Sequence, residues 1–141
     1  MRNNFLVLAL GLSASISAGC QSTKVPEAVL TSFAARFPTT TNVKWSKEDK
    51  TEFEAEFKLS SRAVSANFKA NGDWVVTETT IPVTDLPAAV ASAVDTKYPG
   101  SVFSVIEKVE EPGNKVYYEA TIKWNGKKRE IKVSAAGGFI N

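Results

Sequence analysis

Apolar and polar side chains alternate along two neighbouring stretches of the chain, residues 51–59 and 62–70, and the alternation is strict in the first. In the first stretch the odd-numbered positions are apolar and the even-numbered positions are charged. The apolar residues are Phe53, Ala55, Phe57 and Leu59, and the charged residues are Glu52, Glu54, Glu56 and Lys58. A period of two is typical of an antiparallel strand with one buried face and one face in water. Asn71-Gly72 follows the second stretch and favours a tight hairpin turn, so a further strand is expected over residues 74–81.

The same alternation returns nearer the C-terminus. Residues 115–124 and 127–135 predict two strands joined by Asn125-Gly126, which also favours a hairpin turn. The inward-facing set of the first of these strands is Val116, Tyr118, Ala120 and Ile122. A weaker strand pattern precedes each hairpin, at residues 42–46 and 102–109.

Two short helices are predicted, each bounded by prolines. In the first, Val29, Phe33 and Phe37 recur at every fourth position and form one apolar stripe. We expect Pro26 in the first turn, where its missing N–H is not needed, and Pro38 just beyond the last turn. A second segment has the same features: Pro87, Val90, Val94, Tyr98 and Pro99.

These elements recur in the same order, a helix and then about four strands, in two successive parts of the chain. Matching positions lie 61 apart in the helices, as Pro26 and Pro87 do, and 65 apart in the strands, as Gly72 and Gly137 do. We therefore predict an α+β fold built as a tandem repeat, residues 25–81 and 82–141, with one helix on one face of each antiparallel sheet. Four extra residues around 110–114 account for the two offsets, and the second copy is expected to lack most of its last strand. Whether the two copies share one sheet or one domain stays open.

The N-terminus has the order of a bacterial export signal. Arg2 precedes an apolar run over residues 5–12, and small residues follow up to Gly19, so residues 1–19 are predicted to be a signal peptide. The run is too short to span a membrane, which takes about 20 residues. Cys20 is the only cysteine, and Ser17-Ala18-Gly19-Cys20 resembles a lipoprotein cleavage site, although the family pattern has Leu where Ser17 stands. The alternative is ordinary cleavage and a secreted protein with a free thiol.

Lipidation of Cys20 would anchor the chain, with residues 20–24 as a short polar tether. Gln21 follows the cysteine, and by resemblance to other lipoproteins this favours the periplasmic side of the outer membrane over the inner membrane. Secretion or display on the cell surface is the alternative location.

Composition removes several classes of function. The chain has 141 residues, no histidine and a net charge of +2. Without histidine, Ser-His-Asp and Cys-His catalysis are excluded, as are most zinc sites. A single cysteine excludes an internal disulfide and a Cys-x-x-Cys redox pair. The small net charge argues against nucleic-acid binding, and no nucleotide, zinc or hydrolase motif occurs. We therefore expect neither an enzyme nor a cofactor or metal site.

The pattern resembles the PepSY-like family of exported bacterial proteins. The resemblance rests on the proline-led helix, on Phe-Glu-Ala-Glu-Phe at residues 53–57, and on Phe-Lys-Ala-Asn-Gly-Asp-Trp at residues 68–74. It covers about residues 25–141, and its motifs are turn, core and strand residues. That family is related in fold to the beta-lactamase inhibitory protein. The resemblance thus implies an envelope protein that binds, and in the stronger form inhibits, another protein such as a peptidase or hydrolase.

The outward-facing strand residues are the candidate partner-binding face: Glu52, Glu54, Glu56, Tyr117, Glu119 and Lys123. Tyr117 is out of phase with the core set and is expected to be exposed, as an interface anchor would be. The competing interpretation is an ordinary solvated strand face on which Lys58 or Lys69 balances the glutamates. The same glutamates could instead hold a cation.

Two other segments have simpler interpretations. Residues 127–129, Lys-Lys-Arg, could contact anionic lipid, but the run is shorter than the basic clusters that usually do so. Ser60-Ser61 aligns with Asn125-Gly126 and is expected to be a turn. The sequence therefore favours a protein-binding envelope lipoprotein, with a ligand- or cation-binding protein and a purely structural protein as alternatives.

Overall fold

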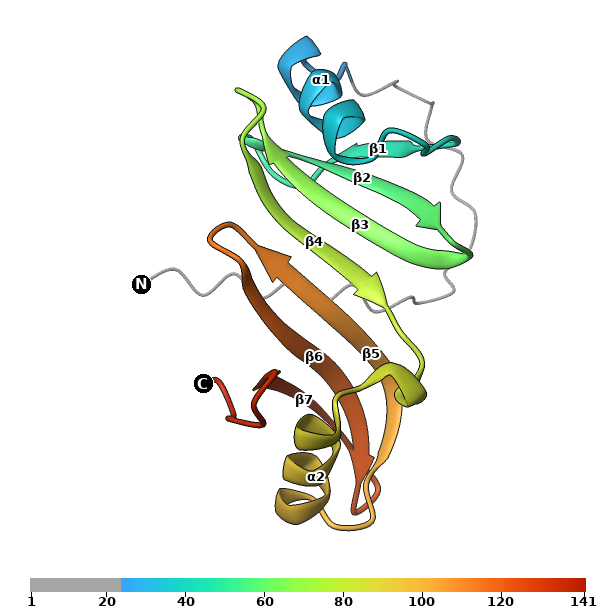
Figure 1. The fold of residues 1–141 in the computed structure, drawn as a ribbon, viewed down its shortest axis with the longest axis vertical. Coiled ribbons are helices and arrows are strands. Elements are labelled where there is room, and N and C mark those ends of the chain that lie inside the picture. The colour runs from blue at the N-terminus through green and yellow to red at the C-terminus, as the bar shows by residue number, and fades with distance from the viewer. Residues whose placement is uncertain (1–23) are drawn as a thin grey trace.

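A computed structural model describes residues 24–141. Its seven strands form one antiparallel sheet in which spatial order follows chain order, and its two helices lie at opposite ends of that sheet (Figure 1). The predicted signal peptide and Cys20 lie outside the described residues. The elements, in chain order, are α1 (Glu27–Arg36), β1 (Lys44–Lys47), β2 (Glu52–Leu59), β3 (Arg62–Lys69), β4 (Trp74–Thr80), the 3-10 helix η1 (Val83–Asp85), α2 (Ala88–Lys97), β5 (Val102–Glu111), β6 (Lys115–Trp124) and β7 (Lys127–Ser134).

The first helix closes an aromatic core on the β1–β4 part of the sheet. Val29 and Phe33 are the buried residues of α1, as the predicted stripe requires. The ring of Phe33 lies 5.2 Å from the rings of Phe37, Trp45 and Phe57. Pro26 is the N-cap residue rather than part of the first turn, because its ψ of 145° is still extended. Its carbonyl accepts the first helical hydrogen bonds, so the prediction was wrong by one position.

The second helix closes a separate, more aliphatic core on β5–β7. Val90 and Val94 are the buried residues of α2. They pack in a cluster with Ile106, Ile122 and Val133. The N-cap is again a proline, Pro87. No residue is shared between this cluster and the one under α1, so the hydrophobic core has two centres.

Strands β4 and β5 join the two ends into one sheet, which settles the question that the sequence pattern left open. The extra residues around 110–114 lengthen β5 as well as its turn, since β5 has ten residues and β1 has four. Residues 107–110 of that longer strand are the ones that pair with β4. The second half has three strands rather than about four, and only an isolated bridge between Val133 and Phe139 follows them.

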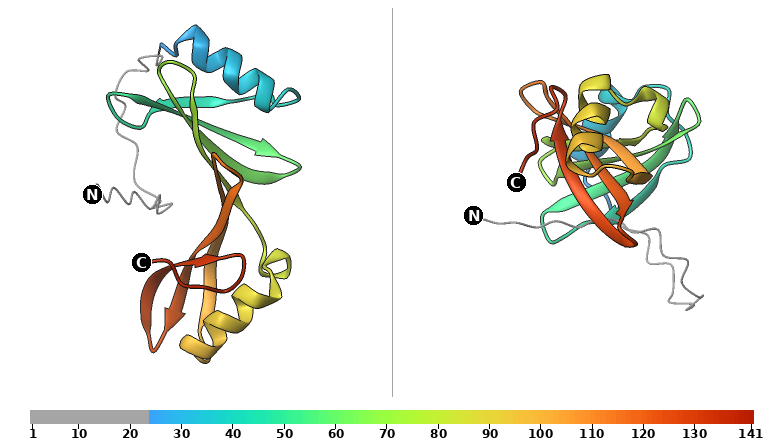
Figure 2. Two further views of the ribbon diagram at one scale, coloured as in Figure 1. Left: turned by 60° about the vertical axis from the view of Figure 1, so that its left-hand side comes forward. Right: turned by 90° about the horizontal axis from the view of Figure 1, so that it is seen from below.

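The two faces of the sheet differ in what covers them. Residues directly opposite each other across strands point to the same face, and the row through Phe57, Val64, Thr79, Lys108, Tyr118 and Val133 runs across six strands. Both hydrophobic clusters contribute to this row, so both helices cover the same face. We call the opposite face the helix-free face. The sheet twists strongly between its two ends, as the side view in Figure 2 shows.

Candidate functional site: the helix-free face of the sheet

The six residues that the sequence singled out all lie on the helix-free face. Glu56 shares a cross-strand row with Ser65, Glu78, Val109 and Tyr117. On β2, Glu52 and Glu54 are an even number of residues from Glu56, so their side chains point to the same face as that of Glu56. On β6 the same holds for Glu119 and Lys123 relative to Tyr117. The structure thus brings two strands far apart in sequence onto one surface.

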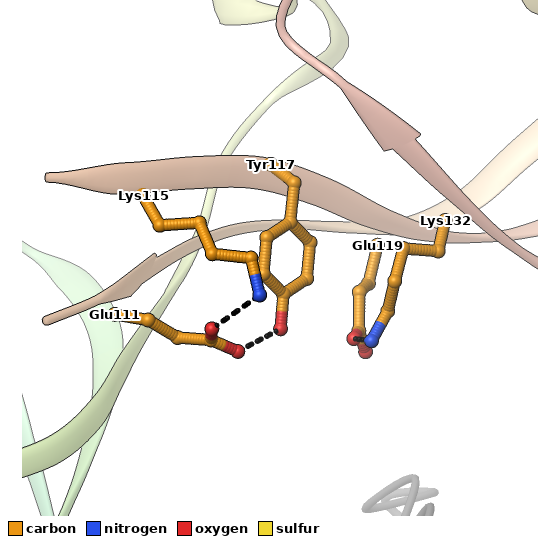
Figure 3. Close-up of polar contacts among 5 residues, drawn as sticks. All are labelled: Glu111, Lys115, Tyr117, Glu119 and Lys132. Atoms are coloured by element: carbon orange, nitrogen blue, oxygen red, sulfur yellow. Dashed lines mark hydrogen bonds and ion pairs between the residues drawn. The ribbon is translucent and has the colours of Figure 1, made fainter. Parts of the chain in front are cut away.

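Tyr117 lies on this face but is not exposed, so the expectation of an exposed anchor was wrong. Only 6% of its surface is accessible. Its hydroxyl donates a hydrogen bond of 2.7 Å to Glu111, and the ammonium groups of Lys115 and Lys132 lie 5.5 and 4.6 Å from its ring (Figure 3). These long side chains fold over the ring, because their aliphatic stems can cover apolar surface while the charged ends stay in water.

Two ion pairs flank Tyr117 on either side. Lys115 Nζ lies 2.7 Å from Glu111, and Lys132 Nζ lies 2.7 Å from Glu119 (Figure 3). Partial burial raises the pKa of Glu111, but the hydrogen bonds from Lys115 and Tyr117 outweigh it and hold that pKa below its ordinary value. Burial, followed by the bond to Glu111, raises the pKa of the Tyr117 hydroxyl, so this group stays protonated. The cluster is therefore a satisfied, rigid part of the face.

Glu54 also departs from expectation, because it is buried rather than solvated. Its accessible fraction is 8%, and Ser46 Oγ donates a hydrogen bond of 3.2 Å to it. Burial, and then the negative charges of Glu48 and Glu56, raise its pKa. Glu52 and Glu56 remain partly exposed, and Glu56 pairs with Lys44 at 3.0 Å.

Two functional candidates escaped the sequence analysis: Glu78 on β4 and Glu107 on β5. Together with Glu54 and Glu56 they line a hollow of about 130 Å³ over strands β2 to β5. Ser65 Oγ donates a weak hydrogen bond of 3.3 Å to Glu78. Burial, and then the negative charges of Glu107 and Glu119, raise the pKa of Glu78 to about 7. Burial, and then Glu119, also raise the pKa of Glu107.

Negative and positive side chains occupy different parts of this face. Carboxylates gather on the central strands β2, β4, β5 and β6, whereas the lysines that pair with them come from the edge strands β1 and β7 or from the end of β6. In the described part of the chain, neither Glu78 nor Glu107 has an ion-pair partner within 4.0 Å. The centre of the face is therefore acidic and its borders are basic.

The chemistry of this surface is set by its carboxylates. Its carboxylates can accept hydrogen bonds and ion pairs from lysine or arginine side chains. Within residues 24–141 no group of three or more potential metal-binding side chains is placed to hold a metal ion. Glu78 is set apart because its charge changes near neutral pH.

The other two segments noted in the sequence have structural roles here. Residues 127–129 begin β7, which is an edge strand, and their side chains are exposed. Lysines on an edge strand discourage pairing with the sheet of another molecule. Ser60 and Ser61 form a tight turn with φ of 49° and 68°, close to the 49° and 75° of Asn125 and Gly126. The predicted turn is confirmed.

Neither helix of the described residues has the length and hydrophobicity needed to cross a bilayer. The family model described as "Putative beta-lactamase-inhibitor-like, PepSY-like" matches residues 17–64 and 51–141. No curated protein matches the chain significantly.

Two solved structures from Bacteroides share the fold. A BLIP-like protein from Bacteroides fragilis is 26% identical, with a TM-score of 0.73 over 82% of this chain and 84% of that one. A protein from Bacteroides eggerthii, described as a "putative periplasmic protein", is 22% identical, with a TM-score of 0.75 over 83% of this chain and 86% of that one. The expected family resemblance is confirmed.

Proposed function

Because this chain belongs to the beta-lactamase-inhibitor-like, PepSY-like family, we propose that it is a non-catalytic envelope protein that binds another protein through its helix-free face. The observation that carries the proposal is the contrast between the two faces. One face is covered by α1 and α2, and in the described residues the other is covered by no helix. A sheet face of seven strands offers enough area for a specific protein interface, which takes roughly 800 Å² per partner.

The partner we propose is an envelope enzyme, a peptidase or hydrolase, whose activity falls when it is bound. The likeness to a BLIP-like protein supports this form of the proposal. The acidic centre of the face adds a chemical preference, since a carboxylate-rich surface favours a partner with exposed lysine or arginine.

We propose that the protein reaches this partner as a lipoprotein. In this proposal residues 1–19 direct export, Cys20 carries the lipid, and Gln21 places the protein on the periplasmic side of the outer membrane. The likeness to a protein described as periplasmic supports export. The alternative is secretion or display on the cell surface.

A second candidate function is binding of a small ligand or cation in the hollow over strands β2 to β5. The observation in its favour is that the hollow is lined by four glutamates, Glu54, Glu56, Glu78 and Glu107. Under this proposal a small cationic metabolite raises the melting temperature of the protein, and Glu78→Gln removes the effect. An unchanged melting temperature would argue against it.

We also propose that the two halves are divergent copies of one unit. Matching contacts support this. Arg36, in the last turn of α1, lies 3.3 Å above the ring of Trp74, and Lys97, in the last turn of α2, lies 3.9 Å from the ring of Phe139. The residues that end the two helices, Phe37 and Tyr98, have nearly identical backbone angles, φ/ψ of −128°/63° and −130°/63°.

The test of the main proposal is affinity capture followed by inhibition. The purified protein is immobilised and challenged with an envelope extract of its source organism, and any retained enzyme is then assayed while the free protein is titrated in. The proposal expects one enzyme to be retained and its activity to fall in step with added protein. If the immobilised protein is folded and retains no enzyme, the result would favour ligand binding or a structural role instead.

A further inference from the structure

The junction between β4 and β5 is the only strand pairing that joins the two helix-bearing halves of the described sheet, and it is as short as the edge pairing of β1 with β2. Four residue pairs join these strands, Thr77 to Thr80 with Glu107 to Glu110, whereas eight join β2 to β3 and eight join β6 to β7. The hydrophobic clusters on the two sides of the junction share no residue. The relative placement of the two helix-bearing halves therefore depends largely on this short ladder and on one further hydrogen bond, from Ile81 to Ile106. The segment that follows β4 adds an ion pair between Arg62 of β3 and Asp85 of η1.

Like charges lie on both sides of this junction. Glu107 is directly opposite Thr80, two residues from Glu78, so the carboxylates of Glu78 and Glu107 are diagonal neighbours across the ladder. Diagonal neighbours on one face of a sheet are close enough for long side chains to meet. Glu107 is in turn directly opposite Glu119 on β6. Three carboxylates thus follow one another across β4, β5 and β6.

Few positively charged side chains lie near Glu78 and Glu107 to balance their negative charges. The charged or titratable groups that face Glu78 from the neighbouring strands are Glu54, Glu56 and Lys58 of β2, Glu107 and Glu111 of β5, Tyr117 and Glu119 of β6, and Lys132 of β7. Lys132 is bound to Glu119, and the lysine nearest Glu56 is Lys44, which is bound to it. Lys58 is exposed at the far side of β3. Glu78 itself receives a hydrogen bond from Ser65.

We propose that the β4–β5 junction is a proton-controlled hinge: when Glu78 and Glu107 are both ionised, their repulsion loosens the ladder and lets the two halves move relative to each other. When either carboxyl is protonated, the ladder closes and the sheet is continuous. The helix-free face would then be rigid at low pH and adjustable at high pH. This inference concerns the fold of the chain alone and stands whether or not the face binds an enzyme.

The pH at which the hinge responds follows from burial and charge. The pKa of Glu78 is raised to about 7 from 4.5, so its proton is lost on crossing neutral pH. The pKa of Glu107 is raised as well. Both groups hold protons more tightly in the closed ladder than in an open one, so closing is favoured below neutral pH and becomes less favourable as the pH rises.

Amide hydrogen exchange tests the hinge on the purified protein. Exchange is measured by NMR at about pH 5.5 and about pH 8.5, and each rate is corrected for its intrinsic dependence on pH. We expect the protection of the hydrogen-bonded amides in residues 77–80 and 107–110 to fall at least about tenfold between the two conditions. Amides of the β2–β3 ladder, in residues 53–57, serve as the internal reference and should keep their protection.

Variants separate the hinge from a general effect of pH. Glu78→Gln and Glu107→Gln, singly and together, should keep the junction protected at the higher pH. Glu130→Gln, at an exposed position of β7, is the matched control and should behave as the unmodified protein does. Equal junction protection at both pH values would overturn the proposal. So would an equal loss of protection in the β2–β3 ladder, because that would mean global destabilisation.

Discussion

The backbone carbonyl oxygen of Ala28 lies so close to Gly72 that a Cβ atom on Gly72 would be 2.7 Å from it. Gly72 ends the turn between β3 and β4 with φ of 92°, and Ala28 is in the first turn of α1. The second half has the same relationship, with Gly137 at φ of 89° and a Cβ position 2.7 Å from the carbonyl oxygen of Ala89. Each helix is thus fixed to its sheet by a glycine that permits backbone-to-backbone contact.

Replacing Gly72 by alanine should destabilise the protein for two reasons. The left-handed backbone costs an alanine about 1 kcal/mol, and the new methyl group must push α1 away from the sheet. We expect Gly72→Ala to lower the free energy of unfolding by about 2–4 kcal/mol in urea titrations. Gly113→Ala is the control, because Gly113 has a φ of 80° but nothing within 4 Å of its Cβ position. Equal losses in the two variants would show that the contact with Ala28 has no effect.

Substitutions in the turn at Ser60-Ser61 should stabilise the protein. Both serines have positive φ, a conformation that Asn and Gly adopt at much lower cost. Ser60→Asn combined with Ser61→Gly copies the turn of Asn125-Gly126, and should raise the free energy of unfolding by about 1 kcal/mol. The converse change, Asn125→Ser with Gly126→Ser, should lower it by a similar amount. Thermal melts of both variants check the prediction, and opposite signs are required.

Most of the fold was predictable because its elements have strong local signals. Strict alternation defined β2 and β6 to within a residue, and the prolines at 26, 38, 87 and 99 bounded both helices. The β4–β5 pairing was not predictable. Alternation along a strand shows which side chains share a face, but it does not show which strand of the other repeat lies beside it. The burial of Tyr117 and Glu54 was missed for a related reason. Lys132 covers Tyr117 and Ser46 covers Glu54 from neighbouring strands, and Lys115 covers Tyr117 from the start of the same strand.

Stability should decline as the pH rises through neutrality. Glu78 has a folded pKa of about 7 and an ordinary value of 4.5, so it binds protons more tightly in the folded state. The stability it contributes is fully present below about pH 4.5 and is lost as the pH rises through about 7. After allowance for its partial exposure, we expect a loss on the order of 1–2 kcal/mol between about pH 5.5 and about pH 8.

Glu78→Gln identifies the group responsible. This variant should unfold at a higher temperature than the unmodified protein at about pH 8, and its pH dependence should be weaker. Glu130→Gln should leave the pH profile unchanged, because Glu130 is exposed at the edge of the sheet. A pH profile that survives Glu78→Gln would assign the effect to other groups.

Tyr117→Phe should cost stability through a single lost hydrogen bond. The ring stays beneath Lys115 and Lys132, while Glu111 loses the donor at 2.7 Å. A hydrogen bond to a charged group contributes about 1.5–3 kcal/mol, and the bond from Lys115 that remains reduces the loss to about 1–2 kcal/mol. In the described residues the hydroxyl of Tyr118 makes no such bond, so Tyr118→Phe is the control. Urea unfolding of both variants gives the comparison, and equal losses would contradict it.

Binding through the helix-free face has to be tested at exposed positions. Glu54 and Tyr117 are unsuitable, since their replacement would damage folding as well as any interface. Glu52 is partly exposed and Lys123 is exposed on the helix-free face, whereas Asp95 is exposed on α2 at the covered side. Glu52→Lys and Asp95→Lys change the net charge equally, so they form a matched pair.

The most direct measurement is the dissociation constant of a captured envelope protein for the unmodified chain and for these variants, by titration calorimetry. We predict that Glu52→Lys and Lys123→Glu each weaken binding by about tenfold or more, while Asp95→Lys leaves it unchanged. If Asp95→Lys weakens binding and the two variants of the helix-free face do not, the partner docks on the helical side and the assignment of the binding face is wrong.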